Sequence, residues 1–313
     1  MIAVVDYQKG NLRSVEKGLV AAGAREVRVT SDACEIARAS TVVLPGVGAF
    51  ADAMATMRAL GQDEAVRERV RAGVPFLGIC LGMQLLFEAG EEGAPEEGGL
   101  VQGLGLIPGV VARMPKQDAE GNTYKIPHVG WNSLVPPACQ PAEPADAAKG
   151  SGAASWRSKG SSRSLVPSAC QPTEQLDAAS RSGTESRRSK PSSRTECASS
   201  GFHGDLRHQN GSRWLTAPTC EALDSGSGFC PGLDAAFACP LFADTRPGEY
   251  FYFTHSYAAP ITAETAAVTR HSVAFASAVQ VGDAAFGVQF HPEKSSDAGH
   301  AVLSAFVRFA KEG

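Results

Sequence analysis

Residues 74–84 read Val-Pro-Phe-Leu-Gly-Ile-Cys-Leu-Gly-Met-Gln, and this stretch decides the fold. Its first six residues are almost all apolar, which is typical of a central strand buried on both faces of a parallel sheet. The strand runs directly into Cys80, and a helix is expected over residues 81–88. A cysteine at this junction matches a strand–nucleophile–helix elbow. The stretch therefore predicts an α/β fold with a nucleophile at the end of a central strand.

Two glycines, Gly78 and Gly82, flank the candidate nucleophile. Side chains at these positions would collide across so sharp a turn. The start of a helix favours the thiolate form of Cys80 and leaves the amide of Leu81 free to donate to an oxyanion. The alternative interpretation is that Cys80 is a small buried hydrophobic residue, and the flanking glycines argue against it.

Short apolar strands and amphipathic helices alternate on both sides of this junction. Strands are expected at residues 2–6, 26–30, 41–44, 124–129, 250–255, 265–270, 273–281 and 284–289. Helices are expected from Asn11, as the N-cap, to Gly23, and at residues 62–72 and 297–310. This order predicts a mainly parallel twisted sheet flanked by helices, with an antiparallel edge.

The middle of the chain has a different composition, with 15 serines in residues 151–200 and few large apolar side chains. The nonapeptide at 133–141 recurs at 164–172 with one substitution. Such a segment cannot bury enough apolar surface to become ordered, and its repeats lack the apolar face of a solenoid. We expect a discontinuous folded domain and a Ser/Arg-rich, tandem-duplicated, mostly disordered insertion, with these bounds: domain 1–134 and 237–313, insertion 135–236.

Charge and hydropathy exclude several classes of protein. The net charge of −4 and a pI near 6.0 give no basic field for nucleic acid. The longest apolar run, residues 76–87, is too short to cross a membrane. The N-terminus shows no charged leader, so we expect a cytoplasmic protein.

A cysteine nucleophile needs a base, and the base needs a group that orients it. His291 and Glu293 follow an apolar strand and flank a proline, so Glu293 can hold the imidazole. Two other histidines, His128 and His255, stay open as residues that line the site. The remaining four are interpreted as structural or surface residues: His203, His208, His271 and His300.

The loop Gly-Val-Gly-Ala-Phe-Ala at 46–51 also fits a degenerate dinucleotide pattern. Pro45 interrupts that turn, and no acidic residue ends a strand about twenty positions later. We interpret the loop as a second oxyanion wall, where backbone approaches a substrate closely. The cysteines lack the short paired spacing of zinc sites, so neither a metal nor another cofactor is expected.

With this triad in place, six motifs make the chain resemble class I, triad-type glutamine amidotransferases. They are Gly-Asn-Leu-Arg-Ser-Val at 10–15, Pro-Gly-Val-Gly-Ala-Phe at 45–50, Phe-Leu-Gly-Ile-Cys-Leu-Gly-Met-Gln-Leu-Leu-Phe at 76–87, Lys-Ile-Pro-His-Val-Gly-Trp-Asn at 125–132, Phe-Thr-His-Ser-Tyr at 253–257 and Gln-Phe-His-Pro-Glu-Lys-Ser at 289–295. The fourth motif narrows the resemblance to the glutaminase subunits of imidazole glycerol phosphate synthases, which serve histidine biosynthesis.

The resemblance implies a mechanism. Cys80 attacks the side-chain amide of glutamine, His291 acts as the shared acid and base, and Glu293 orients His291. Water then hydrolyses the thioester to glutamate. Backbone amides of Leu81 and Val47 form the oxyanion hole.

It also implies a substrate pocket and a partner. Gly46, Gly48, Gln84 and Ser256 would bind glutamine. The ammonia would pass to a (β/α)₈ cyclase subunit, which makes imidazole glycerol phosphate and aminoimidazole carboxamide ribotide. The family's partner interface and ammonia gate correspond to residues on one segment here: Pro127, Trp131 and Asn132.

Two features depart from the family pattern. Gln8 stands where the family usually has glycine, so the first turn could differ in backbone, and the insertion begins just beyond Asn132.

Two other functions compete with this one. The first competing interpretation is another amidotransferase or a γ-glutamyl hydrolase of the same architecture. The other is a non-catalytic interaction protein that uses its Arg-Ser segment, which the intact triad argues against.

Overall fold

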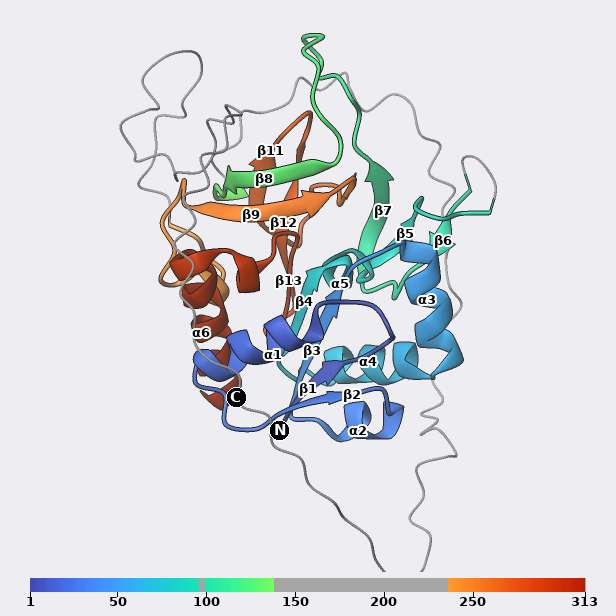
Figure 1. Ribbon diagram of the computed structural model, residues 1–313, viewed down its shortest axis with the longest axis vertical. Helices are drawn as coiled ribbons and strands as arrows, with labels where there is room; N and C mark the ends of the chain where they lie inside the picture. Colours follow the sequence, from blue (N-terminus) through green and yellow to red (C-terminus); the bar gives the residue numbers. More distant parts are fainter. Residues whose placement is uncertain (96–98, 138–235, 313) are drawn as a thin grey trace, which may run out of the picture. The chain divides into compact units, whose positions relative to one another are not determined.

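The computed structural model describes residues 1–95, 99–137 and 236–312 (Figure 1). Most of the expected insertion, residues 138–235, lies outside the described residues, so its disorder stays a prediction. Val135, the first residue of the expected insertion 135–236, is described, and it forms an antiparallel bridge with Val268 through two backbone hydrogen bonds of 3.0 and 2.9 Å.

The central sheet has seven strands in the order β11-β12-β13-β4-β3-β1-β2. All neighbours from β13 to β2 are parallel, whereas β11 and β12 form an antiparallel edge. This confirms the predicted α/β class and its antiparallel edge. The bounds are β1 Ile2–Val5, β2 Val27–Thr30, β3 Thr41–Gly46, β4 Phe76–Cys80, β11 Thr265–Arg270, β12 Ala274–Val281 and β13 Ala285–Val288.

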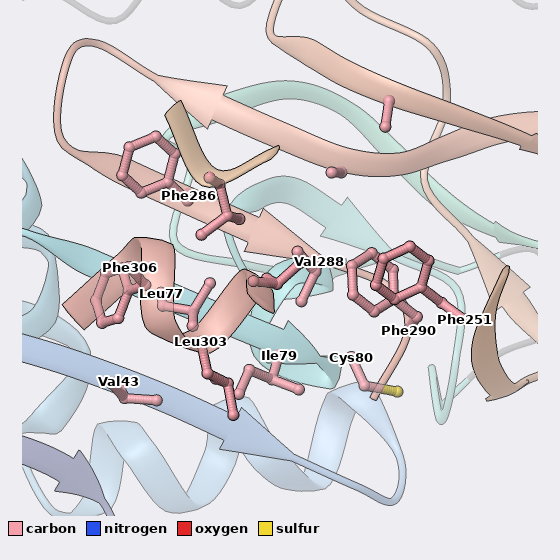
Figure 2. Close-up of a cluster of buried hydrophobic side chains, with 14 of the residues drawn as sticks. Val43, Leu77, Ile79, Cys80, Phe251, Phe286, Val288, Phe290, Leu303 and Phe306 are labelled. Atoms are coloured by element: carbon pink, nitrogen blue, oxygen red, sulfur yellow. The ribbon is translucent and has the colours of Figure 1, made fainter. Parts of the chain in front are cut away.

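Helices cover both faces of this sheet, because the inner strands are buried at every position and need cover on both sides. One core packs under α1 (Leu12–Ala21) and α6 (Ser296–Glu312). Figure 2 shows part of this core, with Leu303 and Phe306 of α6 near Leu77 of β4. The other core packs under α2 (Ala33–Arg38), α3 (Phe50–Ala59) and α4 (Gln62–Arg71).

Two smaller sheets and three short helical segments complete the described chain. A four-stranded sheet has the order β10-β7-β5-β6, and a two-stranded ribbon pairs β8 with β9. Their bounds are β5 Phe87–Gly90, β6 Val101–Gln102, β7 Ile107–Arg113, β8 His128–Ser133, β9 Tyr250–His255 and β10 Tyr257–Ala258; the helical segments are α5 Leu81–Gln84, η4 Pro240–Phe242 and η5 Pro292–Lys294.

The expected and observed elements differ in several places. The helix after Cys80 ends at Gln84 rather than at residue 88, because the next residues form β5 against β7. The strand expected at 124–129 begins only at His128, directly after Pro127, which has no N–H to donate to a ladder. Asn11 precedes α1 but makes no side-chain capping bond, and the helices α2 and α3 were not predicted.

The register of the parallel strands brings distant residues to one edge of the sheet. Gly46 at the end of β3 lies opposite Cys80 at the end of β4. Val288 at the end of β13 lies opposite Ile79. Gln289 and His291 follow Val288 and therefore reach the edge at which Cys80 ends β4.

Candidate active site

Cys80 has a backbone conformation that is rare for a residue with a side chain. Its φ is 54° and its ψ is −108°, and its side chain is nearly buried. Such strain persists only where the surrounding structure enforces it, and it is concentrated at functional sites. The sulfur lies at the end of β4 (Figure 2). Since α5 is only one turn long, the helix macrodipole is weaker than the sequence pattern suggests.

The flanking glycines leave no room for side chains. A Cβ at Gly78 would lie 2.7 Å from the carbonyl oxygen of Gly82, and a Cβ at Gly82 would lie 1.7 Å from that of Leu44. The steric argument for glycine therefore holds at both positions, although at Gly82 the collision is with β3 rather than across the elbow.

His291 and Glu293 form a buried pair, as their spacing predicts. Nδ1 of His291 lies 2.9 Å from Oε1 of Glu293, and both side chains are 3% exposed. Burial lowers the pKa of His291, but interactions with Cys80 and with Glu293 outweigh it and raise the pKa to about 9. The other ring nitrogen, Nε2, has no hydrogen-bond partner among the described residues, so it is available to Cys80.

The turn that carries His291 is tied to the ribbon. The N–H of His291 donates to the carbonyl of Tyr252 at 2.9 Å. The hydroxyl of Ser295 donates to the carbonyl of His291 at 2.7 Å and accepts from the N–H of Tyr252 at 3.0 Å. Ser295 is fully buried, and these bonds fix the imidazole relative to β9.

A cavity of about 440 Å³ opens beside Cys80. Segments from three parts of the chain line it: the loop after β3, the elbow with the end of β5, and the ends of the ribbon. The lining residues are Val47, Gly48, Ala49, Cys80, Leu81, Gln84, Glu92, Pro127, Thr254, His255, Ser256 and Tyr257.

Most of the residues expected in the substrate pocket and oxyanion hole line this cavity. Gly46 does not; it lies opposite Cys80 in the sheet, and the hydroxyl of the buried Tyr7 sits where its Cβ would be. Burial, and then the nearby Cys80, raise the pKa of Tyr7 above its ordinary value. Val47 is 41% exposed at the loop between β3 and α3.

The residues expected at the partner interface separate into two groups. Pro127 lines the cavity, whereas Trp131 is 44% exposed on β8. The rings of Trp131 and Tyr252 meet edge-on, with 6.2 Å between the ring centroids. The side chain of Asn132 instead links the ribbon to β11: its Nδ2 donates to the carbonyl of Arg270 at 3.0 Å and lies 3.2 Å from Nε2 of His128.

Glu92 is the residue of the cavity that sequence reasoning missed most clearly. It follows β5, and one of its oxygens accepts the N–H of Phe50 at 3.2 Å. Burial raises its pKa, the bond from Phe50 lowers it, and the charge of Asp52 raises it, with a net increase. In the sequence it lies in an acidic run that looks like a solvated turn, so no local signal identifies it.

The two histidines left open form a buried pair. Nδ1 of His128 lies 3.0 Å from Nε2 of His255, and only His255 lines the cavity. Burial, with the neighbouring histidines, lowers the pKa of His128 to about 3. Burial also lowers the pKa of His255 to about 4, although the hydrogen bond to the Tyr257 carbonyl acts in the opposite direction and raises this pKa. Both rings are therefore neutral at pH 7.

The other histidines lie away from Cys80 or outside the described residues. His271 stacks on His128 at 4.2 Å and bonds the carbonyl of Lys125 at 3.0 Å, and His300 lies on α6 beside Ser304. His203 and His208 fall outside the described residues. Within residues 1–95, 99–137 and 236–312, no three His, Cys, Asp or Glu side chains are placed to hold a metal ion. No helix of that part of the chain is long and apolar enough to cross a membrane.

Comparison with known proteins gives a family match over two segments. The model of the family "Glutamine amidotransferase class-I" matches residues 3–139 and 230–309, and thus brackets most of the region expected to be an insertion.

Curated relatives match somewhat less than half of this chain. The chain is 49% identical over 135 residues to the imidazole glycerol phosphate synthase subunit HisH of a Geobacillus species, covering 43% of this chain and 61% of that protein. It is 51% identical over 133 residues to the HisH subunit of Moorella thermoacetica, covering 42% and 58%. The match thus spans about three fifths of each relative's length. Among solved structures, PurLQS from Thermotoga maritima aligns with a TM-score of 0.49 and 12% identity, over 98% of this chain and 97% of that one.

Proposed function

Because this chain belongs to the class-I glutamine amidotransferase family, we propose that it hydrolyses glutamine to glutamate and ammonia through a thioester on Cys80. One observation carries the proposal: a strained cysteine and a buried histidine–glutamate pair occupy the same edge of a parallel sheet, beside a cavity of about 440 Å³.

The reaction needs one nucleophile and one proton carrier. The thiolate of Cys80 attacks the carboxamide carbon of glutamine and forms a tetrahedral oxyanion. When the C–N bond breaks, His291 gives its proton to the departing nitrogen, which leaves as ammonia. His291 then takes a proton from water as the water attacks the thioester. This step expels the thiolate of Cys80, releases glutamate, whose carboxyl proton goes to solvent, and leaves His291 protonated for the next cycle. The raised pKa of His291, about 9, suits this role because the ring is protonated before the amine leaves.

Both oxyanions need donors close to Cys80. The amide of Leu81 begins α5 directly after the nucleophile, and the loop with Val47 lines the same cavity. We assign the oxyanion hole to these two backbone amides.

Recognition of glutamine is assigned to the polar residues of the cavity. The side-chain nitrogen of Gln84 already donates to the carbonyl of Tyr257 and to Gln289 Oε1, both at 2.9 Å. Only its oxygen is left for the substrate, where it can accept an N–H. Glu92 supplies the carboxylate of the cavity and pairs with the α-ammonium group. Gly48 and Ser256 complete the lining of the substrate pocket, and Gly46 would support it from the end of β3, opposite Cys80.

The ammonia is proposed to pass to a (β/α)₈ cyclase subunit, as the HisH subunits are named for imidazole glycerol phosphate synthase. The products would be imidazole glycerol phosphate and aminoimidazole carboxamide ribotide, made in the cytoplasm as a step of histidine biosynthesis. The exposed side chains of Val129 and Trp131 on β8, next to Pro127 at the cavity, support an interface there. Asn132 would act in that interface through the ribbon that it stabilises.

The domain division stays part of the proposal. Residues 1–134 and 237–313 would form the amidotransferase domain, and 135–236 the insertion. The break in the family match between residues 139 and 230 supports this division.

The test compares glutamine and ammonia as nitrogen sources. In a complex with the cyclase, Cys80→Ala should abolish glutamine-dependent synthesis and leave ammonia-dependent synthesis intact. The matched control is Cys239→Ala, which changes another buried thiol, packed beside η4. Loss of both activities in Cys80→Ala would show that the residue is structural.

A second comparison identifies the acceptor. Glutamine hydrolysis is measured alone, with the cyclase and its ribotide ligand, and with other synthase partners. Stimulation only by a partner that is not a cyclase would refute the assignment to histidine biosynthesis but leave the proposed glutaminase activity in place.

The role of Glu92 is tested by Glu92→Gln. This variant should raise the KM for glutamine about tenfold or more, with a smaller change in kcat, because it removes binding of the ammonium group.

A further inference from the structure

One backbone carbonyl, that of Tyr257, fixes the direction of a hydrogen-bond network around Cys80. It accepts from Gln84 Nε2 at 2.9 Å and from His255 Nδ1 at 2.8 Å. Because a carbonyl oxygen can only accept, the atoms that face it must both be donors. This sets the amide orientation of Gln84 and the tautomer of His255 without further assumption.

The first branch of the network leads to the nucleophile. The same nitrogen of Gln84 lies 2.9 Å from one atom of the Gln289 amide, which must therefore be the oxygen. The nitrogen of Gln289 then points the other way, and it lies 3.6 Å from Sγ of Cys80. Gln289 is fully buried, directly after β13 and next to the end of β4.

We propose that Gln289 is a further catalytic group, whose side-chain N–H hydrogen-bonds the sulfur of Cys80 and stabilises its thiolate. The proposal deepens the proposed function because it concerns the same nucleophile. A hydrogen bond to an ionised acceptor is about twice as strong as one between neutral groups, and burial increases this difference. The N–H of Gln289 therefore favours the thiolate over the thiol.

The second branch keeps the network fixed. Since His255 Nδ1 is a donor, its Nε2 accepts from Nδ1 of His128, 3.0 Å away. Nε2 of His128 then accepts from Asn132, at 3.2 Å. Each ring makes one donating and one accepting bond as a neutral imidazole, so neither ring needs a second proton.

Several titratable groups also surround the sulfur. His291, backed by Glu293, faces it from the turn after β13; Tyr7, which follows β1, interacts with it electrostatically; and His255 and Glu92 line the cavity. The amide of Gln289 differs from all of these because it carries no charge at any pH. Its contribution should therefore shift the whole titration of the thiol rather than add a step to it.

The test measures the alkylation of Cys80 by iodoacetamide between pH 5 and 10 in the full-length chain. The tryptic peptide of residues 72–113 contains no other cysteine, so mass spectrometry follows Cys80 alone. The variants are Gln289→Met, which removes the donor, and Gln289→Glu, which keeps the shape and places an acceptor against the sulfur. The matched controls are Gln280→Met and Gln280→Glu on β12, whose amide donates to the carbonyl of Gly282 at 3.1 Å.

We expect alkylation at pH 7 to be about tenfold slower in Gln289→Met and slower still in Gln289→Glu, with half-maximal alkylation about one pH unit higher. The Gln280 variants should behave as the unaltered chain does. If Gln289→Met does not fold, as judged by circular dichroism, Gln289→Glu alone decides.

Unaltered pH profiles in the folded Gln289 variants would overturn the proposal, as would faster alkylation of Gln289→Glu than of the unaltered chain. Glutamine hydrolysis is measured on the same samples. A chain that hydrolyses no glutamine with any partner, yet shows the expected alkylation shift, would refute the proposed function and support the role of Gln289.

Discussion

Gly46 should accept an alanine only if Tyr7 first loses its hydroxyl. A Cβ built on Gly46 would lie 1.8 Å from Oη of Tyr7, but 3.2 Å from its Cζ and 3.0 Å from Cβ of Leu81. In Tyr7→Phe the first contact disappears and the other two need to relax by only a few tenths of an ångström. Tyr7 is completely buried, so its ring has little room to retreat.

These distances set the expected energies. In the unaltered background the hydroxyl or β3 must move by about 1 Å, which belongs at the upper end of the overpacking range, about 3 kcal/mol. In the Tyr7→Phe background we expect about 1 kcal/mol. The coupling energy of the double-mutant cycle is therefore about 2 kcal/mol, well above the roughly 0.5 kcal/mol seen for independent sites.

Urea unfolding of the four proteins, followed by circular dichroism, measures this coupling. The control is Gly82→Ala, whose Cβ would lie 1.7 Å from the backbone oxygen of Leu44, so Tyr7→Phe cannot relieve its clash. Equal destabilisation by Gly46→Ala in both backgrounds would refute the reasoning, and rescue of Gly82→Ala would show that Tyr7→Phe stabilises the fold generally.

Three further predictions concern the backbone and the buried pair. Gln8 has a φ of 65°, so Gln8→Gly should raise the free energy of unfolding by about 0.5–1 kcal/mol, whereas Gln8→Ala should give no gain in urea unfolding. The pKa of His291 is about 9 in the folded chain and about 6.5 when unfolded, so its stabilisation is complete below pH 6.5 and is lost as the pH rises to 9. Glu293→Gln should reduce that loss by at least about 1 kcal/mol in urea unfolding at the two pH values, and an unchanged loss would contradict the assignment. Ser295→Ala removes the bonds to Tyr252 and to the His291 carbonyl, so it should lower the unfolding free energy by about 2 kcal/mol and also lower kcat for glutamine hydrolysis; stability loss with unchanged kcat would mean that the turn does not position His291.

The sequence alone predicts the strands of the central sheet, because each strand has a recognisable local pattern. Buried strands such as β1 and β4 are continuous apolar runs between turn residues. The end of α5 was not accessible in this way. Residues 85–88 extend an apolar pattern that fits a helix or a strand equally well, and only pairing with β7, about 20 residues later, decides for β5.

The site shows the same limit at the level of side chains. Cys80, Gly78 and Gly82 could be selected because a tight elbow restricts residue types within five positions. Gln289 could not, since its role depends on which end of its amide faces the sulfur. That orientation is set by a carbonyl on another strand, through the amide of Gln84.

Gln8 is an intermediate case. The family resemblance gives glycine as the usual residue at this position, so the sequence indicated that the first turn could differ in backbone. In the structure Gln8 has a left-handed φ of 65°, and its N–H donates to Asp6 Oδ1 at 2.7 Å. Glycine adopts this conformation without strain, whereas a residue with a side chain does not.

The ribbon explains how a long connection between β8 and β9 is compatible with an intact site. Its two strands pair from His128 with His255 at one end to Ser133 with Tyr250 at the other. The first pair belongs to the network beside the cavity, whereas the chain between β8 and β9 leaves and returns at the second pair, five residues or about 17 Å away. The entropic cost of closing this connection grows only slowly with its length. Changes in length between the strands should therefore leave the geometry of Cys80 unaltered, while a change in register between β8 and β9 would displace His255 and the turn of His291 together.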